Sequence, residues 1–105
     1  MKLDRVEEAL KTVMKNVGHY EAIEVSDQYI VWAEDGEGKS FHANNQKKIQ
    51  VIQGTIDYFT KEEGDPNVEA IQSALNQNRV AFSLSSVQYE EETEKIHYEW
   101  IFEVS

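Results

Sequence analysis

The chain has 105 residues, with 20 acidic and 10 basic side chains and a net charge of -10. This length fits one domain, and the acidic balance argues against ordinary binding to nucleic-acid phosphates or an anionic membrane, since both need a basic surface. The absence of cysteine excludes disulfides, thiolate metal sites and thiol chemistry. We therefore expect residues 1–105 to form one domain. The sequence shows neither an apolar run long enough to cross a membrane nor a signal peptide.

The first predicted element is a helix over residues 3–17. Leu3, Val6, Leu10, Val13 and Val17 recur at spacings of three and four, which places them in one apolar stripe. Gly18 is expected to end this helix, because glycine adopts a positive φ easily.

A hairpin is predicted next, with strands over Tyr20–Val25 and Gln28–Ala33. Both segments are rich in β-branched and aromatic residues, and the Ser26–Asp27 pair between them suits a tight turn. Residues 34–47 are polar, contain two glycines and follow no strand or helix period. They predict a loop, and a loop of this length is often functional.

Residues 48–60 return to strand character. Ile52, Ile56 and Tyr58 share one face with Gly54, which indicates a disruption or another backbone packed close by. A bulge near Val51 would account for the change of parity before Ile52. The Asp65–Pro66 pair then predicts the start of a second helix, which ends at residues 76–78.

Two strands close the chain, over Val80–Tyr89 and Ile96–Val104. The last strand alternates strictly, with five apolar residues on one face and mainly polar residues on the other. In the strand before it, the apolar parity changes, which predicts a bulge near Ser85–Ser86. The predicted fold is therefore α+β: an antiparallel or mixed sheet of about five strands packed with two helices, in the order α-β-β-β-α-β-β.

Few residues suggest chemistry. Residues 33–40 nearly match a phosphate-binding loop, but three carboxylates would lie beside the phosphates and no helix start follows. The same acidic stretch lacks the ligand spacing of a calcium-binding loop. His19, His42 and His97 show no metal-ligand spacing, and for His97 we expect an acidic cross-strand partner such as glutamate. We predict no catalytic residue, no metal and no cofactor, and hence no enzyme.

Two apolar residues stand out as possible contacts with a partner. Trp32 would lie near the end of its strand at the start of the long loop, so we expect it to be partly exposed. Ile101 is the apolar residue on the otherwise polar face of the last strand.

The chain also resembles a known family. Residues 52–60, the pair Asp65–Pro66 and the closing hairpin with residues 86–90 and 96–100 resemble small proteins of the tail modules of long-tailed phages and prophages. The order of elements is similar to that of the tail terminator (tail completion, head–tail joining) family.

This resemblance implies a structural protein of the virion tail or neck, assembled in the cytoplasm of a bacterial host. Tail terminators form a ring, typically of six subunits, that stops tail-tube growth and meets the head connector. Their partners are thus copies of the same chain, tail-tube proteins and head-connector proteins, while DNA passes through the lumen without specific binding, and no membrane is involved. The expected subunit contacts are Trp32, Lys39, Phe41 and Ile101.

Two alternatives remain open on the sequence. One is a monomeric acidic binding or inhibitor module that covers a basic protein partner. The other is a different ring protein of the head–tail neck. Self-assembly distinguishes the first alternative from the ring, because the binding module would stay a monomer.

Overall fold

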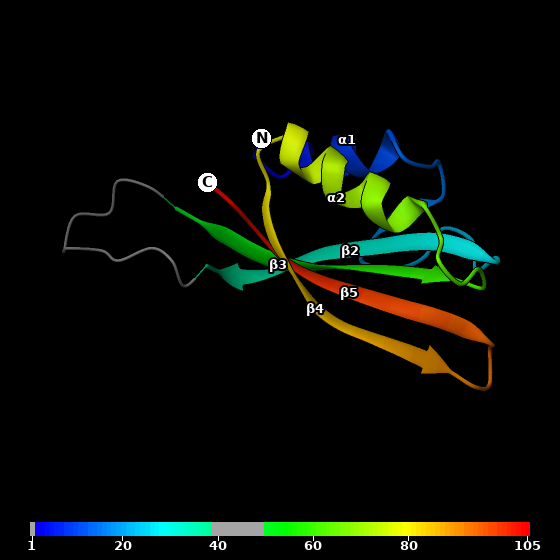
Figure 1. The fold of residues 1–105 in the computed structure, drawn as a ribbon. Coiled ribbons are helices and arrows are strands. Elements are labelled where there is room, and N and C mark those ends of the chain that lie inside the picture. The colour runs from blue at the N-terminus through cyan, green and yellow to red at the C-terminus, as the bar shows by residue number, and fades with distance from the viewer. Residues whose placement is uncertain (1, 39–49) are drawn as a thin grey trace.

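The structure is a computed structural model that describes residues 2–38 and 50–105. Two helices cover one face of a five-stranded sheet, and within these residues the other face carries no helix (Figure 1). The elements in chain order are α1 (Asp4–Lys11), β1 (Val17–His19), β2 (Gln28–Glu37), β3 (Ile52–Thr60), α2 (Asn67–Gln77), β4 (Ala81–Glu90) and β5 (Lys95–Val104). This order and the α+β class are as predicted.

The strand order in the sheet is β1-β2-β3-β5-β4. β1 runs parallel to β2, and the other neighbours are antiparallel, so the sheet is mixed. The strand β5 lies between β3 and β4 although it comes last in sequence. β4 and β1 therefore form the two edges of the sheet.

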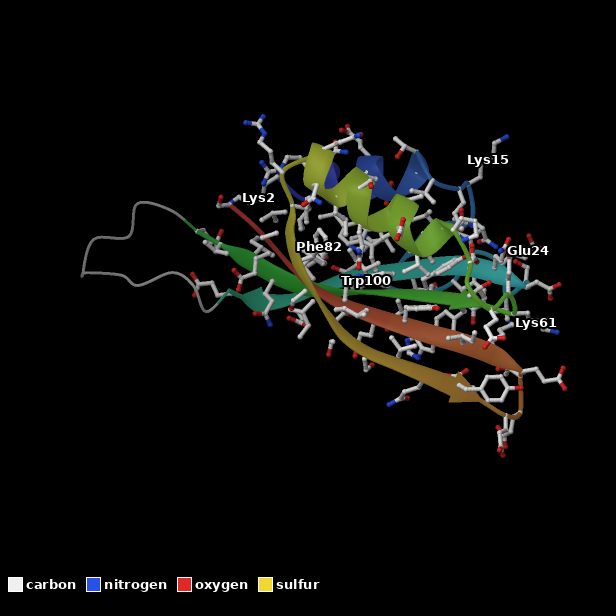
Figure 2. The ribbon with its side chains drawn as sticks, in the orientation of Figure 1. Lys2, Lys15, Glu24, Lys61, Phe82 and Trp100 are labelled. Carbon is white, nitrogen blue, oxygen red and sulfur yellow. The ribbon has the colours of Figure 1, made fainter. Side chains whose placement is uncertain are left out.

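The core lies between the helices and the sheet. As the alternation predicts, Trp100, Phe102 and Val104 of β5 are buried on the helix-facing side. They pack with Ile56 and Tyr58 of β3 and with the buried stripes of both helices. Figure 2 shows Trp100 beneath α2, and its Nε1 donates a hydrogen bond to Gln72 Oε1 at 2.9 Å.

The first helix is shorter than predicted. α1 ends at Lys11, and Thr12 donates its hydroxyl to the Ala9 carbonyl at 2.6 Å. Val17 is buried because it pairs with Ile30 at the start of β1. Gly18 lies inside β1 and does not end the helix. A Cβ there would meet the Glu21 carbonyl oxygen at 2.0 Å, so the glycine permits the close return of the chain.

The predicted hairpin before β2 is wrong. Residues 20–25 form no strand, and the parallel strand β1 takes the place beside β2 instead. The Asn16 side chain holds this segment by donating to the Glu24 carbonyl at 2.9 Å and to Ser26 Oγ at 3.1 Å. Ile23 and Val25 consequently face solvent, each 69% exposed.

The predicted loop at 34–47 begins too early. Residues 34–37 continue β2, because they pair with the first residues of β3. The rest of that predicted loop, from residue 39 on, lies outside the described residues.

The irregularity predicted near Val51 rests partly on Ile49, which lies outside the described residues, and Val51 itself precedes β3. β3 pairs with β5 in regular register from Ile52 to Thr60, whereas the pairing of β2 shifts between Glu34 and Gly36. The close packing predicted at Gly54 is confirmed, since a Cβ there would lie 2.1 Å from the Ala33 carbonyl oxygen.

The second half of the chain agrees closely with the prediction. α2 begins at Asn67, one residue later than the predicted start at Pro66, and the side chain of Asp65 accepts the Asn67 amide at 2.8 Å. The predicted bulge in β4 is confirmed, because the register with β5 shifts between Leu84 and Ser86.

Candidate functional site

Trp32 does not have the exposure predicted for a contact residue. Its side chain is 2% exposed, because β2 continues past it and places it on the helix-facing side of the sheet. The indole stacks on His19 at 3.9 Å between ring centroids and meets the edge of Phe102 at 6.2 Å. The expectation of partial exposure is therefore wrong, and Trp32 acts as a core residue in this conformation.

The other predicted contact residues have different outcomes. Lys39 and Phe41 lie outside the described residues. Ile101 is half-buried on the face of the sheet that carries no helix, beside a shallow groove of about 200 Å³ that Ser83 and Phe82 also line. Its role at a subunit interface stays a prediction.

A small polar cluster lies at the β1 edge. Glu34 Oε1 is 2.8 Å from His19 Nε2, and the other carboxylate oxygen accepts the Tyr20 hydroxyl. Burial would raise the pKa of Glu34, but the hydrogen bonds from Tyr20 and His19 outweigh it and hold this pKa below its ordinary value. The pairing ties the chain after β1 to β2.

A second histidine lies on the uncovered face of the sheet. His97 Nε2 is 2.7 Å from Asp57 Oδ1, and its Nδ1 is 3.4 Å from Glu90 Oε2. The imidazole also stacks on Phe59 at 4.3 Å, and Phe59 stacks on Tyr29 at 4.6 Å. The acidic cross-strand partner predicted for His97 is thus confirmed, and the structure provides two of them, Asp57 and Glu90. The arrangement joins four adjacent strands, β2, β3, β5 and β4, across this face.

A buried network surrounds Asp65, which is 4% exposed. Its carboxylate accepts the Tyr58 hydroxyl at 2.5 Å and the Gln28 side-chain amide at 3.0 Å. Burial raises the pKa of Tyr58 to about 12, and the neighbouring Asp65 adds to this. Burial alone would raise the pKa of Asp65, but the hydrogen bonds from Tyr58, the Asn67 amide and others lower it overall. The network fixes the start of α2 on the sheet.

The segment that nearly matches a phosphate-binding loop has the wrong local structure for one. Ala33, Glu34 and Gly36 are paired with β3 inside β2. A phosphate loop instead needs backbone N–H groups gathered before a helix. Within residues 2–38 and 50–105, no cluster of three or more histidine or acidic side chains is arranged to hold a metal ion.

An exposed apolar surface on β4 was missed by the sequence reasoning. Leu84, Val87 and Tyr89 are 47%, 50% and 61% exposed. They lie on the helix-facing side of the sheet, in register with buried or half-buried residues of β5, but near its edge. We call these three residues, together with Ile96, the β4 shelf. Its signal in the sequence is the absence of any charged residue between Ala81 and Tyr89.

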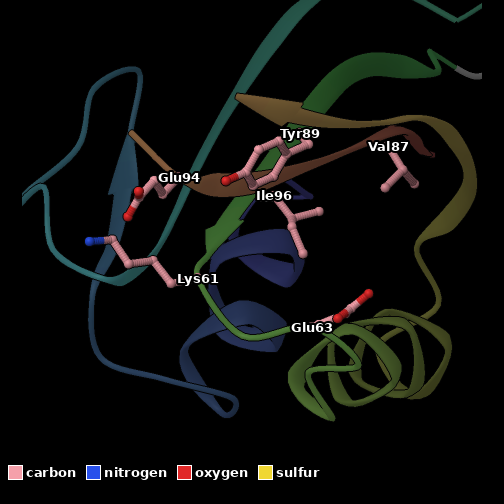
Figure 3. Close-up of a pocket in the computed structure, with 6 residues that line it drawn as sticks. All are labelled: Lys61, Glu63, Val87, Tyr89, Glu94 and Ile96. Carbon is pink, nitrogen blue, oxygen red and sulfur yellow. The ribbon is translucent and has the colours of Figure 1, made fainter. Parts of the chain in front are cut away.

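Three residues of the shelf, Val87, Tyr89 and Ile96, form the floor of an open groove of about 770 Å³. Figure 3 shows Val87, Tyr89 and Ile96 around the same space, with Glu63 near the start of α2 and Lys61 and Glu94 at one side. The residues combine an apolar floor with a mostly acidic rim, which is an arrangement suited to binding another chain.

Comparison with known proteins gives a match in fold. No protein-family model and no curated protein matches the chain. A chain of the solved structure described as "Virion of native gene transfer agent (GTA) particle" matches with a TM-score of 0.55 and 12% sequence identity. The match covers 94% of this chain and 89% of that chain. The two chains share a fold.

That likeness extends over nearly the whole chain. The tail terminator family itself stays a prediction, because no family model supports it. None of the helices in the described part of the chain is long and apolar enough to cross a membrane.

Proposed function

We propose that the chain is a structural protein of a phage-like particle. The observation that carries this proposal is the fold shared, over 94% of the chain, with a component of a gene transfer agent virion. In this proposal the protein is not an enzyme. The polar clusters around Asp65, His19 and His97 have structural roles, since each joins elements that are distant in sequence.

The finer proposal is a ring at the tail or neck of the particle. The ring would terminate the tail tube, join it to the head connector and let DNA pass through its lumen. The net charge of -10 supports this role, because like charge keeps DNA from adhering to the wall. Subunits related by rotation would meet head to tail through different surfaces. Assembly would take place in the cytoplasm of the bacterial host.

Size-exclusion chromatography with light-scattering detection, over a wide concentration range, measures the mass of any assembly. Negative-stain microscopy of the same fractions shows whether it is a ring. We expect a particle near six times 12.1 kDa with a central hole. Purified tail tubes provide a second assay, since the protein should cap their ends and stop further growth. A monomer at every concentration that also fails to cap tubes contradicts the ring and favours the acidic binding module.

A substitution at Ile101 tests whether this residue lies in the subunit interface of the proposed ring. Ile101→Asp places a charge on the uncovered face without entering the core, so the subunit should fold normally but assemble at least tenfold less readily. Ser73→Asp on the exposed side of α2 is the matched control and should assemble as the wild type does. Equal assembly of the two variants excludes Ile101 from the interface.

A further inference from the structure

The β4 shelf borders an edge of the sheet that has no partner strand. β4 pairs with β5 along one side, and in the described structure no strand follows on the other side. Edge strands usually carry charged residues or proline that prevent unwanted pairing. The nine residues Ala81–Tyr89 contain neither. Outward backbone N–H and C=O groups are therefore available for strand addition.

The second half of β4 suits such addition best. The bulge between Leu84 and Ser86 interrupts the edge, but from Ser86 to Glu90 the pairing with β5 is regular. Val87 and Tyr89 lie in this half and project into the groove. A strand added here would place alternate side chains over the same apolar floor, because strand side chains alternate between the two faces.

The charges around the shelf indicate what kind of segment fits. Glu63 and Glu94 line the groove, and the turn after β4 contributes Glu91 and Glu92. Lys61 opposes them, but it is paired with Asp27 at 3.7 Å. The rim is therefore acidic, and it favours a segment with lysine or arginine near its apolar residues.

A second copy of the chain fits less well. Among residues 2–38 and 50–105, the exposed large apolar residues away from β4 are Tyr20, Ile23 and Val25 at the opposite edge, and Glu21 and Glu24 lie among them. Docking that segment on the shelf would bring carboxylates against the acidic rim. Such like-charge contacts oppose association.

We propose that the β4 shelf binds an extended segment of another protein, with apolar residues flanked by lysine or arginine. The segment adds as a strand along Ser86–Glu90, seats its apolar side chains against Val87, Tyr89 and Ile96, and places its basic residues at Glu63, Glu94 and the neighbouring turn. The proposal does not depend on ring formation.

A displayed library of random dodecapeptides, selected on the purified full-length protein, tests this proposal without knowledge of the natural partner. We expect the enriched peptides to alternate apolar residues and to carry lysine or arginine. Synthetic copies should bind the wild type and Val25→Glu equally, but Val87→Glu at least tenfold more weakly. Val25 is the matched control because it is an exposed valine at the other edge, and Tyr89→Ala serves as a second shelf variant.

Two further measurements separate the parts of the proposal. N-methylation of alternate peptide amides should abolish binding, since strand addition needs those N–H groups. Affinity should fall severalfold between low and high salt because of the acidic rim. No enrichment, enriched peptides that are acidic or unpatterned, or binding that Val87→Glu or salt leaves unchanged overturns the proposal.

The same variants distinguish this proposal from the ring. Val87→Glu should assemble as the wild type does, because the shelf is assigned to another protein. If Val87→Glu instead abolishes ring formation, or if Val87→Cys in this cysteine-free chain forms a disulfide-linked dimer, the shelf is a contact between copies. Either result overturns the proposed occupant and leaves the structural role of the protein intact.

Discussion

At the scale of single residues, Asp65 links acid stability to the start of α2. The folded-state pKa of Asp65 lies below its ordinary value. Its contribution to the free energy of unfolding is therefore fully present above the unfolded-state pKa of about 4, and it is lost as the pH falls through the folded-state pKa. Asp65→Asn should lower the free energy of unfolding by about 1–3 kcal/mol at pH 6. The difference from the wild type should shrink toward pH 2. Urea unfolding at several pH values measures this.

Glu69→Gln is the control for Asp65, since Glu69 is an exposed carboxylate on the same helix. This variant should unfold within about 0.5 kcal/mol of the wild type at pH 6. A loss of stability in Asp65→Asn that stays constant down to pH 2 would mean that titration of Asp65 does not contribute.

Gly54 tests close packing of two backbones. A Cβ at this position would lie 2.1 Å from the Ala33 carbonyl oxygen and 2.7 Å from the Glu34 Cα. These are backbone atoms of β2, so the strands must separate, and Gly54→Ala should cost about 3 kcal/mol. Gly64→Ala has free space but a φ of 71°, and should cost about 1 kcal/mol. Thermal unfolding compares them, and equal losses would contradict the packing argument.

At the scale of elements, one hydrogen bond holds α2 to the centre of the sheet. Gln72→Met keeps the side-chain volume but leaves the buried Trp100 N–H without its acceptor. We expect a loss of about 1–3 kcal/mol, measured by denaturant unfolding. Gln77→Met, at an exposed position of the same helix, should change little. In a Trp100→Phe background, Gln72→Met should lower the free energy of unfolding much less, because the indole N–H that would lose its acceptor is no longer present.

The elements that the sequence predicts well are those with buried, alternating faces. β5 alternates because one side meets the helices, and the bulge in β4 is visible as a change of apolar parity. The hairpin at 20–33 could not be excluded in this way, because residues 20–25 have strand-like composition but no burial. Tertiary contacts decide which segment pairs with β2. The short strand β1, with Gly18 and His19, takes that position instead of residues 20–25.

The same reasoning explains the errors at the candidate contacts. Trp32 looked exposed because the acidic, glycine-containing residues after it resemble a loop, but pairing with β3 extends β2 through them. The uncharged run of β4 is visible in the sequence, but the exposure of the β4 shelf could not be predicted from it, since that exposure depends on where α2 stops covering the sheet. Ile101 was placed correctly because its parity in β5 is unambiguous.

At the scale of the whole molecule, the net charge of -10 should govern how copies approach one another. At about 10 mM salt the screening length is near 30 Å, whereas at 0.15 M it is about 8 Å. We therefore expect self-association to strengthen as salt is added, because repulsion is screened while apolar contacts persist. Sedimentation velocity from 10 mM to 0.5 M salt measures this. Association that weakens with salt would instead indicate that opposite charges hold the copies together.

The position of β5 has a consequence for how the protein is made. β5 pairs with both β3 and β4, so residues as distant as Ile52 and Val104 must meet before the sheet is continuous. A nascent chain on the ribosome lacks β5 until residues 95–104 have left the exit tunnel. Until then β3 and β4 have no common neighbour, and the core lacks Trp100 and Phe102. The sheet is thus completed only once β5 has emerged, and a chain without β5 also lacks Ile96, which lines the groove beside β4.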